Sequence, residues 1–144
     1  MKASLMILAA TIAISTAAAS RGLGTDPPKA TGEEIYKGIC QGCHMPDGRG
    51  AQGAGTYPAL GGNAKLASAH FTASTVYHGR HNMPHFGPQP ELGEFEAFAT
   101  VHLDDEEIAS VVNYVRSHFG NHYTDALTAK DVAALHAEPA STAK

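Results

Sequence analysis

The sequence predicts an all-α domain of three to five helices, and two amphipathic patterns together with the chain length predict it. One pattern begins at Thr31 and the other occupies 103–120. Each has apolar residues at helical spacing and a capping residue at its start. The chain has 144 residues, which is the length of a single core preceded by a short leader.

Residues 1–20 have the organisation of a secretory signal peptide. Lys2 precedes an apolar stretch over 5–14, and the small residues of 17–20 follow it. This pattern predicts a periplasmic protein, with an uncleaved N-terminal anchor as the alternative. The apolar stretch is shorter than the roughly 20 residues of a membrane span, and no later stretch approaches that length. We therefore expect no stable membrane span in the mature chain.

Residues 21–30 contain Gly, Thr, Asp and a Pro pair, which predicts a flexible lead-in. The first helix is expected to begin directly after it. Thr31 and Glu34 have the spacing of a capping box, in which each side chain accepts a hydrogen bond from the other residue's backbone. Apolar residues follow at helical spacing, so the helix should continue into the next motif.

The segment Cys40-Gln41-Gly42-Cys43-His44 is the C-x-x-C-H signature of covalent haem attachment. The two thiols add to the vinyl groups of the porphyrin, and the adjacent imidazole binds the iron. A zinc site is disfavoured because these are the only two cysteines of the chain. A small disulfide between Cys40 and Cys43 is the alternative. The motif predicts one haem c per chain, with His44 as the proximal ligand.

The glycine-rich segment 46–55 contains a literal G-x-G-x-x-G at Gly48, Gly50 and Gly53. A dinucleotide site needs a strand before this motif and a helix after it. Here the haem motif precedes it and Tyr57-Pro58 follows. We interpret the glycines as backbone that wraps closely around the haem edge.

A weak helical pattern over 63–76 and a second short helix from Ser74 to Gly79 are expected next. The loop 78–87 then holds Met83, which Pro84 keeps out of any helix. A thioether is a suitable sixth ligand for an electron-transfer haem, so Met83 is the candidate for the other axial position. His78, His81 and His85 surround it, which leaves open bis-His ligation or a separate zinc or copper site.

The last firm helix is expected to begin at Asp104, whose carboxylate can cap it, and to stop at Gly120. Before it, apolar residues in 88–102 predict a short extra helix that either covers the haem edge or forms a docking surface; they are Leu92, Phe95 and Phe98. After it, residues 125–144 form a C-terminal extension that could include a short helix.

The formal net charge is −4 and becomes about −5 once Lys2 leaves with the signal peptide. A negative protein is poorly suited to nucleic acid or an anionic membrane surface. We therefore expect no nucleic acid as a partner, and a protein partner with a basic docking surface.

Several segments together resemble the class I c-type cytochromes, in particular the small bacterial monohaem domains similar to cytochrome subunits of alcohol and aldehyde dehydrogenases. The resemblance extends over residues 31–135 and depends on these segments: Gly32 and Tyr36, Cys40 to His44, Tyr57 to Asn63, Met83 to Gly87, Asp105 to Ala109, Asn113 to Val115 and Phe119 to Asn121.

The resemblance implies the class I cytochrome c fold over 31–124, with helices around one covalently bound haem. It implies that the first and last helices cross, with Gly32 and Tyr36 packing against Val111 and Tyr114. It also implies that the carbonyl of Pro58 accepts the Nδ1 proton of the proximal His, which fixes the ring.

The expected function is therefore that of a periplasmic monohaem cytochrome that carries single electrons, free or as a subunit of a dehydrogenase complex. The chain is not expected to be an enzyme itself. Its donor would be a dehydrogenase, and its acceptor another cytochrome or a terminal oxidase. The alternative is a haem enzyme or sensor whose sixth position is open or occupied by a histidine.

Overall fold

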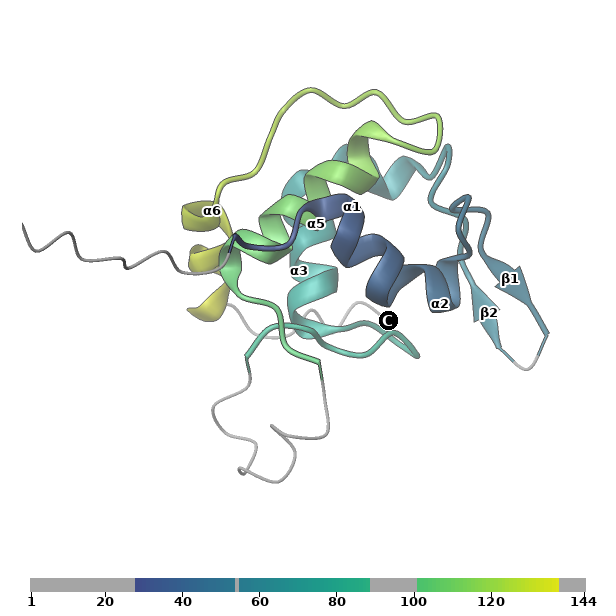
Figure 1. Cartoon of the computed structure of the whole chain (residues 1–144), viewed down its shortest axis with the longest axis horizontal. Coiled ribbons are helices and arrows are strands. Elements are labelled where there is room, and N and C mark those ends of the chain that lie inside the picture. The colour runs from purple at the N-terminus through teal and green to yellow at the C-terminus, as the bar shows by residue number, and fades with distance from the viewer. Residues whose placement is uncertain (1–27, 54, 89–100, 138–144) are drawn as a thin grey trace, which may run out of the picture.

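The computed structural model describes residues 28–53, 55–88 and 101–137. The expected signal peptide, most of the lead-in and the expected helix around 92–98 lie outside these ranges. Helices dominate the described residues, as predicted, and one pair of two-residue strands accompanies them (Figure 1). No helix within these ranges is both long and apolar enough to cross a membrane.

The first helix is continuous from Gly32 to His44 and confirms the prediction that it runs into the C-x-x-C-H motif. It consists of α1 (Gly32–Ile35), a π-helical turn (Tyr36–Cys40) and α2 (Gln41–His44). The predicted capping box is present, because Thr31 Oγ1 accepts from Glu34 N at 3.3 Å and Glu34 Oε2 accepts from Thr31 N at 2.8 Å. The wider π turn ends at Cys40, the first cysteine of the motif, and such turns are common at functional sites.

The glycine-rich segment forms a small hairpin that sequence analysis did not predict. Strand β1 (Ala51–Gln52) pairs with strand β2 (Thr56–Tyr57) in antiparallel register. Two glycines of the motif, Gly48 and Gly50, are required for close approach, and the groups that approach them are parts of the protein. At Gly48, where φ is +68°, a Cβ would lie 2.6 Å from the ring of Phe119.

The middle of the chain differs from the predicted pair of helical segments. A 3₁₀ turn (Ala64–Ala67) is followed by a single helix, α3 (Ala69–His78). The break between them falls at Ser68, whose Oγ accepts from Phe71 N at 3.1 Å and so starts a new helix. The expected end at Gly79 is confirmed, with φ of +73°.

Helix α5 (Asp105–Ser117) begins as predicted, since Asp104 accepts from Glu106 N and Glu107 N. It ends before the predicted stop at Gly120. His118 already has extended backbone, and Asn121 Nδ2 donates to the buried carbonyl of Val115 at 3.0 Å. The tertiary structure therefore supplies the cap that terminates this helix.

Helices α1 and α5 cross at Gly32 (Figure 1). A Cβ on Gly32 would lie 2.2 Å from the carbonyl oxygen of Ser110 and 2.8 Å from Cβ of Tyr114. The aromatic ring of Tyr36 lies 5.7 Å from that of Tyr114. The contacts with Tyr114 are those that the resemblance implied, whereas the backbone closest to Gly32 is that of Ser110 rather than Val111.

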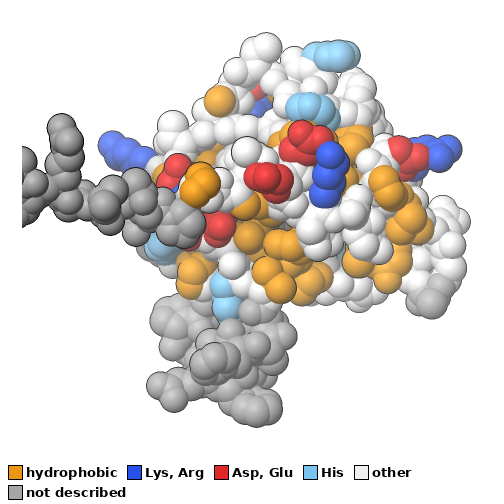
Figure 2. All heavy atoms as spheres, viewed as in Figure 1, with side chains coloured by type: hydrophobic (Ala, Val, Ile, Leu, Met, Phe, Trp, Pro, Cys, Tyr) orange, Lys and Arg blue, Asp and Glu red, His pale blue; other side chains and the backbone are white. Residues whose placement is uncertain are grey.

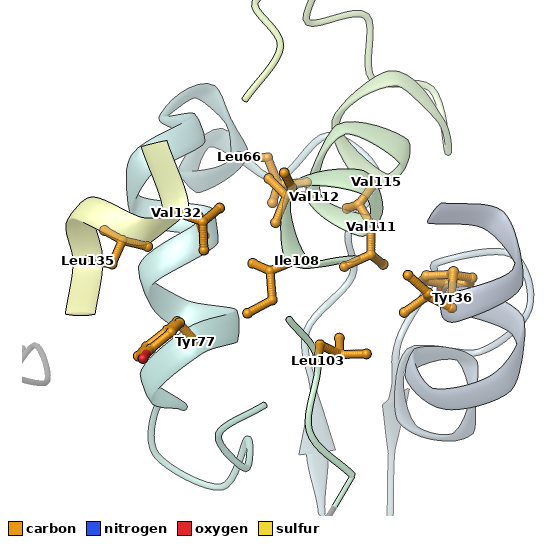
Figure 3. Packing of buried hydrophobic residues seen from close by; sticks show 13 residues of the cluster. Tyr36, Leu66, Tyr77, Leu103, Ile108, Val111, Val112, Val115, Val132 and Leu135 are labelled. Atoms are coloured by element: carbon orange, nitrogen blue, oxygen red, sulfur yellow. The ribbon is translucent and has the colours of Figure 1, made fainter. Parts of the chain in front are cut away.

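The expected C-terminal extension contributes to the core. Its described part forms α6 (Ala129–Ala133) and a 3₁₀ turn (Ala134–Ala137). Val132 and Leu135 are fully buried there. Figure 3 shows them on the side of the core next to Tyr77 of α3, with Ile108 of α5 lying between them and Leu103.

One buried arginine joins three parts of the chain. Arg116 is only 1% exposed. Its Nε donates to the carbonyl of Leu66 at 2.8 Å, and its Nη2 donates to the Asp125 carboxylate at 2.8 Å and 2.9 Å. These bonds fix the end of α5 to the 3₁₀ turn and to the segment that leads to α6.

Candidate haem site

The imidazole of His44 is buried and held in one orientation. Its Nδ1 lies 3.0 Å from the carbonyl oxygen of Pro58. A carbonyl can only accept, so Nδ1 carries the proton and Nε2 keeps its lone pair for a metal. This geometry fits the ligand position that the C-x-x-C-H motif predicts for His44.

The Pro58 carbonyl reaches His44 because the glycine-rich segment folds back on itself. Gly50 N donates to His44 O at 3.0 Å, and the pairing of β1 with β2 returns the chain toward the helix. At Gly50, where φ is +67°, a Cβ would lie 2.1 Å from Tyr57 O and 2.7 Å from the carbonyl carbon of Pro58. Any larger residue would therefore displace the group that orients His44.

The two cysteines lie on the same helix as His44. Both are free thiols, so they are not joined in the disulfide considered as an alternative. Cys40 is partly buried and Cys43 is exposed. Burial, followed by the nearby thiol of Cys43, raises the pKa of Cys40 to about 11, so Cys40 is protonated at neutral pH. An uncharged thioether suits this position better than a thiolate.

Met83 lies in a loop whose backbone is fixed by hydrogen bonds. Met83 N donates to Arg80 O at 2.9 Å, and Arg80 N donates to Met83 O at 3.0 Å. The loop is joined to α3 farther along, where Phe86 N donates to Val76 O at 3.0 Å. The side chain of Met83 is half-buried. The loop therefore presents the thioether from a fixed position.

The histidines around Met83 have different environments. His81 is exposed, while the Nε2 atoms of His78 and His85 are buried without a hydrogen-bond partner within the described part of the chain. A surface hollow of about 390 Å³ is lined by residues 78–81 and 83–85. Among the residues that the structure describes, no three His, Cys, Asp or Glu side chains are arranged to hold a separate metal ion.

These features fit a covalently bound haem. The site offers an imidazole oriented by the Pro58 carbonyl, two free thiols one helical turn apart, and buried ring nitrogens that have no partner among the described residues. Apolar side chains gather just below the first helix in the view of Figure 2. Partly buried apolar residues also border the core, among them Ile39, Leu60, Val76 and Phe86. A porphyrin would cover such a surface.

Sequence comparison agrees with the site. Residues 29–119 match the family model of cytochrome c. The chain therefore belongs to the cytochrome c family, whose members bind haem c covalently and transfer electrons through its iron.

Three relatives are similar to most of this chain. It is 33% identical to the fructose dehydrogenase cytochrome subunit of Gluconobacter japonicus, in an alignment 118 positions long that covers 75% of this chain and 22% of that protein. It is 34% identical to the cytochrome c subunit of alcohol dehydrogenase (quinone) of Gluconobacter oxydans (strain 621H), over 78% of this chain and 23% of that protein. The gluconate 2-dehydrogenase cytochrome c subunit of Pantoea cypripedii is 31% identical, over 73% of this chain and 24% of the relative. This chain thus spans less than a quarter of each relative.

Sequence analysis identified His44, Met83 and, through the resemblance, Pro58, but it gave no role to Arg80. The sequence does show one arginine within a histidine-rich loop. Whether that arginine is buried decides its role, and the sequence pattern of a loop does not reveal burial.

Proposed function

We propose that this chain is a periplasmic monohaem cytochrome that carries single electrons, either free or as part of a dehydrogenase complex. Cys40 and Cys43 hold one haem c, and His44 and Met83 are the axial ligands. The hydrogen bond from His44 Nδ1 to Pro58 O is the observation that carries the proposal. This hydrogen bond leaves Nε2 of His44, the last residue of the C-x-x-C-H motif, available as a ligand.

Bound haem supplies a change of one electron at its iron. The role of His44 is to donate its Nε2 lone pair, and the Pro58 carbonyl increases the basicity of the ring by accepting the Nδ1 proton. Burial of His44 keeps water away from this side. Met83 contributes a neutral thioether, which favours the ferrous state. Because its loop is already fixed by hydrogen bonds, little rearrangement is needed between the two oxidation states.

The named functions of the relatives support a dehydrogenase as the electron donor. All three are cytochrome subunits of dehydrogenases, which act on fructose, an alcohol or gluconate by their names. We assign this chain the same kind of partner, with another cytochrome or a terminal oxidase as acceptor. On this assignment the chain performs no chemistry on the organic substrate.

The axial assignment is tested by spectroscopy of the protein expressed in the periplasm. The oxidised protein should show the weak near-red band of thioether-ligated ferric iron. Met83→Ala should abolish this band. Met45→Ala is the matched control, because it removes the other described methionine, which lies next to His44, and should leave the band unchanged.

Two outcomes would contradict the assignment. An unmutated protein that lacks the band and readily binds carbon monoxide when reduced has an open sixth position, as in a haem enzyme or sensor. An unmutated protein that lacks the band and resists carbon monoxide has histidine in that position. His78 and His85 are then the residues to replace, since their Nε2 atoms lack partners in the described chain.

Mass spectrometry and substrate-dependent reduction test the remaining parts of the proposal. The purified chain should weigh one haem more than the polypeptide and should begin near residue 20. In extracts of the organism that produces it, addition of a dehydrogenase substrate should reduce the haem. Reduction that proceeds at the same rate without any such substrate would contradict the assigned donor.

A further inference from the structure

Arg80 is a half-buried cation that has no carboxylate paired with it among the described residues. Its guanidinium carbon lies 5.6 Å from the centre of the Phe71 ring. Its Nε is buried and has no hydrogen-bond partner among the described residues. An arginine remains charged at any physiological pH, and burial of a charge is costly unless it is paired. The guanidinium of Arg80 therefore requires an anionic hydrogen-bond acceptor that the described residues do not provide.

None of the described ion pairs provides an anion for Arg80. They involve other basic residues, namely Lys29, Lys37, Arg49, Arg116 and His136. Instead, Arg80 lines the hollow around Met83 together with His78 and His85, whose buried Nε2 atoms also have no hydrogen-bond partner in the described part of the chain. Three residues that carry such nitrogens thus line one hollow, and these nitrogens have no acceptor among the described residues. Such a group of nitrogens is complementary to an anion.

The position of Arg80 indicates which anion this is. Its backbone N–H and C=O are both bonded to the backbone of Met83, so the backbone of Arg80 is held next to that of the proposed axial ligand. A guanidinium is also well suited to bind a carboxylate through two parallel hydrogen bonds. The haem proposed for this site has two carboxylates, its propionates.

We propose that Arg80 binds a haem propionate and that its positive charge raises the reduction potential. This inference rests on the proposed function, since it requires the haem. A cation beside the haem destabilises the more positive ferric state relative to the ferrous state. The loop would then provide two contributions in the same direction, the thioether of Met83 and the charge of Arg80.

The contact can be tested in the unmutated protein by NMR of the reduced, diamagnetic form. The Nε–H of Arg80, assigned by its loss in Arg80→Lys, should show a nuclear Overhauser effect to the propionate methylene protons. The chemical shift of this Nε–H should not change when inorganic phosphate is added. Arg49 is the matched control, because its side chain is 85% exposed and paired with Asp47, and it should show no effect to the haem.

Three results would overturn the inference while His/Met ligation is intact. The first is a resonance with effects only to protein protons. The second is a resonance displaced by phosphate, which would indicate a site for a free anion. The third is loss of the resonance to rapid solvent exchange, because a buried and hydrogen-bonded N–H exchanges slowly. Absence of the near-red band in the unmutated protein would instead contradict the proposed function itself.

Potentiometry tests the effect of the charge. Arg80→Gln should shift the ferric/ferrous ratio at fixed potential about tenfold toward ferric, which is about 59 mV for one electron. Arg80→Lys keeps the charge, so its ferric/ferrous ratio should be close to that of the unmutated protein. Arg49→Gln should change the ratio less than about twofold.

A purely structural role of Arg80 predicts lower stability with an unchanged reduction potential. Unchanged potential in Arg80→Gln with the near-red band present would refute this part of the proposal, and if that variant takes up no haem, the NMR result decides.

Discussion

Replacement of Gly32 by Ala tests the crossing of α1 and α5 most directly. The added Cβ would lie 2.2 Å from Ser110 O and 2.7 Å from Ser110 C, and ordinary contacts of this kind begin near 3.4 Å. Both obstructing atoms belong to the backbone of α5, so rotation of a side chain cannot relieve the clash. The two helices would have to separate by roughly 1 Å, which disturbs the packing around them.

The magnitude follows from two opposing effects. Overpacking at a rigid contact costs about 3 kcal/mol, at the upper end of its usual range. The better helix propensity of Ala returns up to about 1 kcal/mol. The net loss of about 2 kcal/mol should lower the Tm by about 8–16 °C for a domain of this size.

Gly38→Ala is the matched control within the same helix. Gly38 is exposed and a Cβ there would meet no atom within 4 Å. This variant should therefore gain about 0.5–1 kcal/mol in unfolding free energy. Guanidinium unfolding followed by far-UV circular dichroism measures both variants. Equal midpoints for Gly32→Ala and Gly38→Ala would refute the close crossing.

Three further predictions concern the haem environment and the stability of the fold. Gly50→Ala should displace the Pro58 carbonyl from the proximal imidazole, so that a less basic ligand stabilises ferric iron less and the reduction potential rises. Arg116→Met should lower the unfolding free energy by about 3 kcal/mol in guanidinium titrations, because buried carbonyls lose their donor. Hydrogen bonds from Arg116 hold the pKa of the Asp125 carboxyl below its ordinary 3.8. Since this pKa is lower in the folded state, the contribution is complete above about pH 5, well above the unfolded value of 3.8, and is lost as the pH falls through the lower folded value. Asp125→Asn should therefore give a shallower loss of stability as the pH falls below about 5, measured by guanidinium titrations at a series of pH values.

Each of these predictions has an outcome that would contradict it. Gly53→Ala is the control for Gly50→Ala, because a Cβ on Gly53 meets nothing within 4 Å, and equal potentials in the two variants would argue against an orienting role for Pro58. Wild-type stability in Arg116→Met would show that the buried network contributes little. If Asp125→Asn loses stability at low pH as steeply as the unmutated protein, other carboxylates, such as Asp104, cause most of that loss.

Sequence reasoning was most successful where the decisive interactions are local. The capping box at Thr31 and the cap at Asp104 each close within a few residues, so their spacing can be read directly. The C-x-x-C-H motif is local for the same reason. Ser68 shows the limit of this approach, since its cap is also local but the pattern was read as helical on both sides of it.

The contacts that orient the site connect residues that are distant in the sequence. The bond between His44 and Pro58 was anticipated only through resemblance to a family, since nothing in the spacing requires it. The end of α5 at Ser117 depends on Asn121, whose side chain also bonds to the segment at Leu60. Neither contact produces a periodic pattern in the sequence.

The sequence by itself determined the helical class, the starts of the first and last helices and the attachment motif, because these depend on backbone groups satisfied within one or two turns. Only the tertiary structure decided that residues up to Leu135 complete the core and that Ser110 is the close neighbour of Gly32. It also revealed that Nε of the half-buried Arg80 has no hydrogen-bond partner among the described residues. Burial and the absence of a partner are properties of the packed chain, and for that reason no pattern of residue types specifies them.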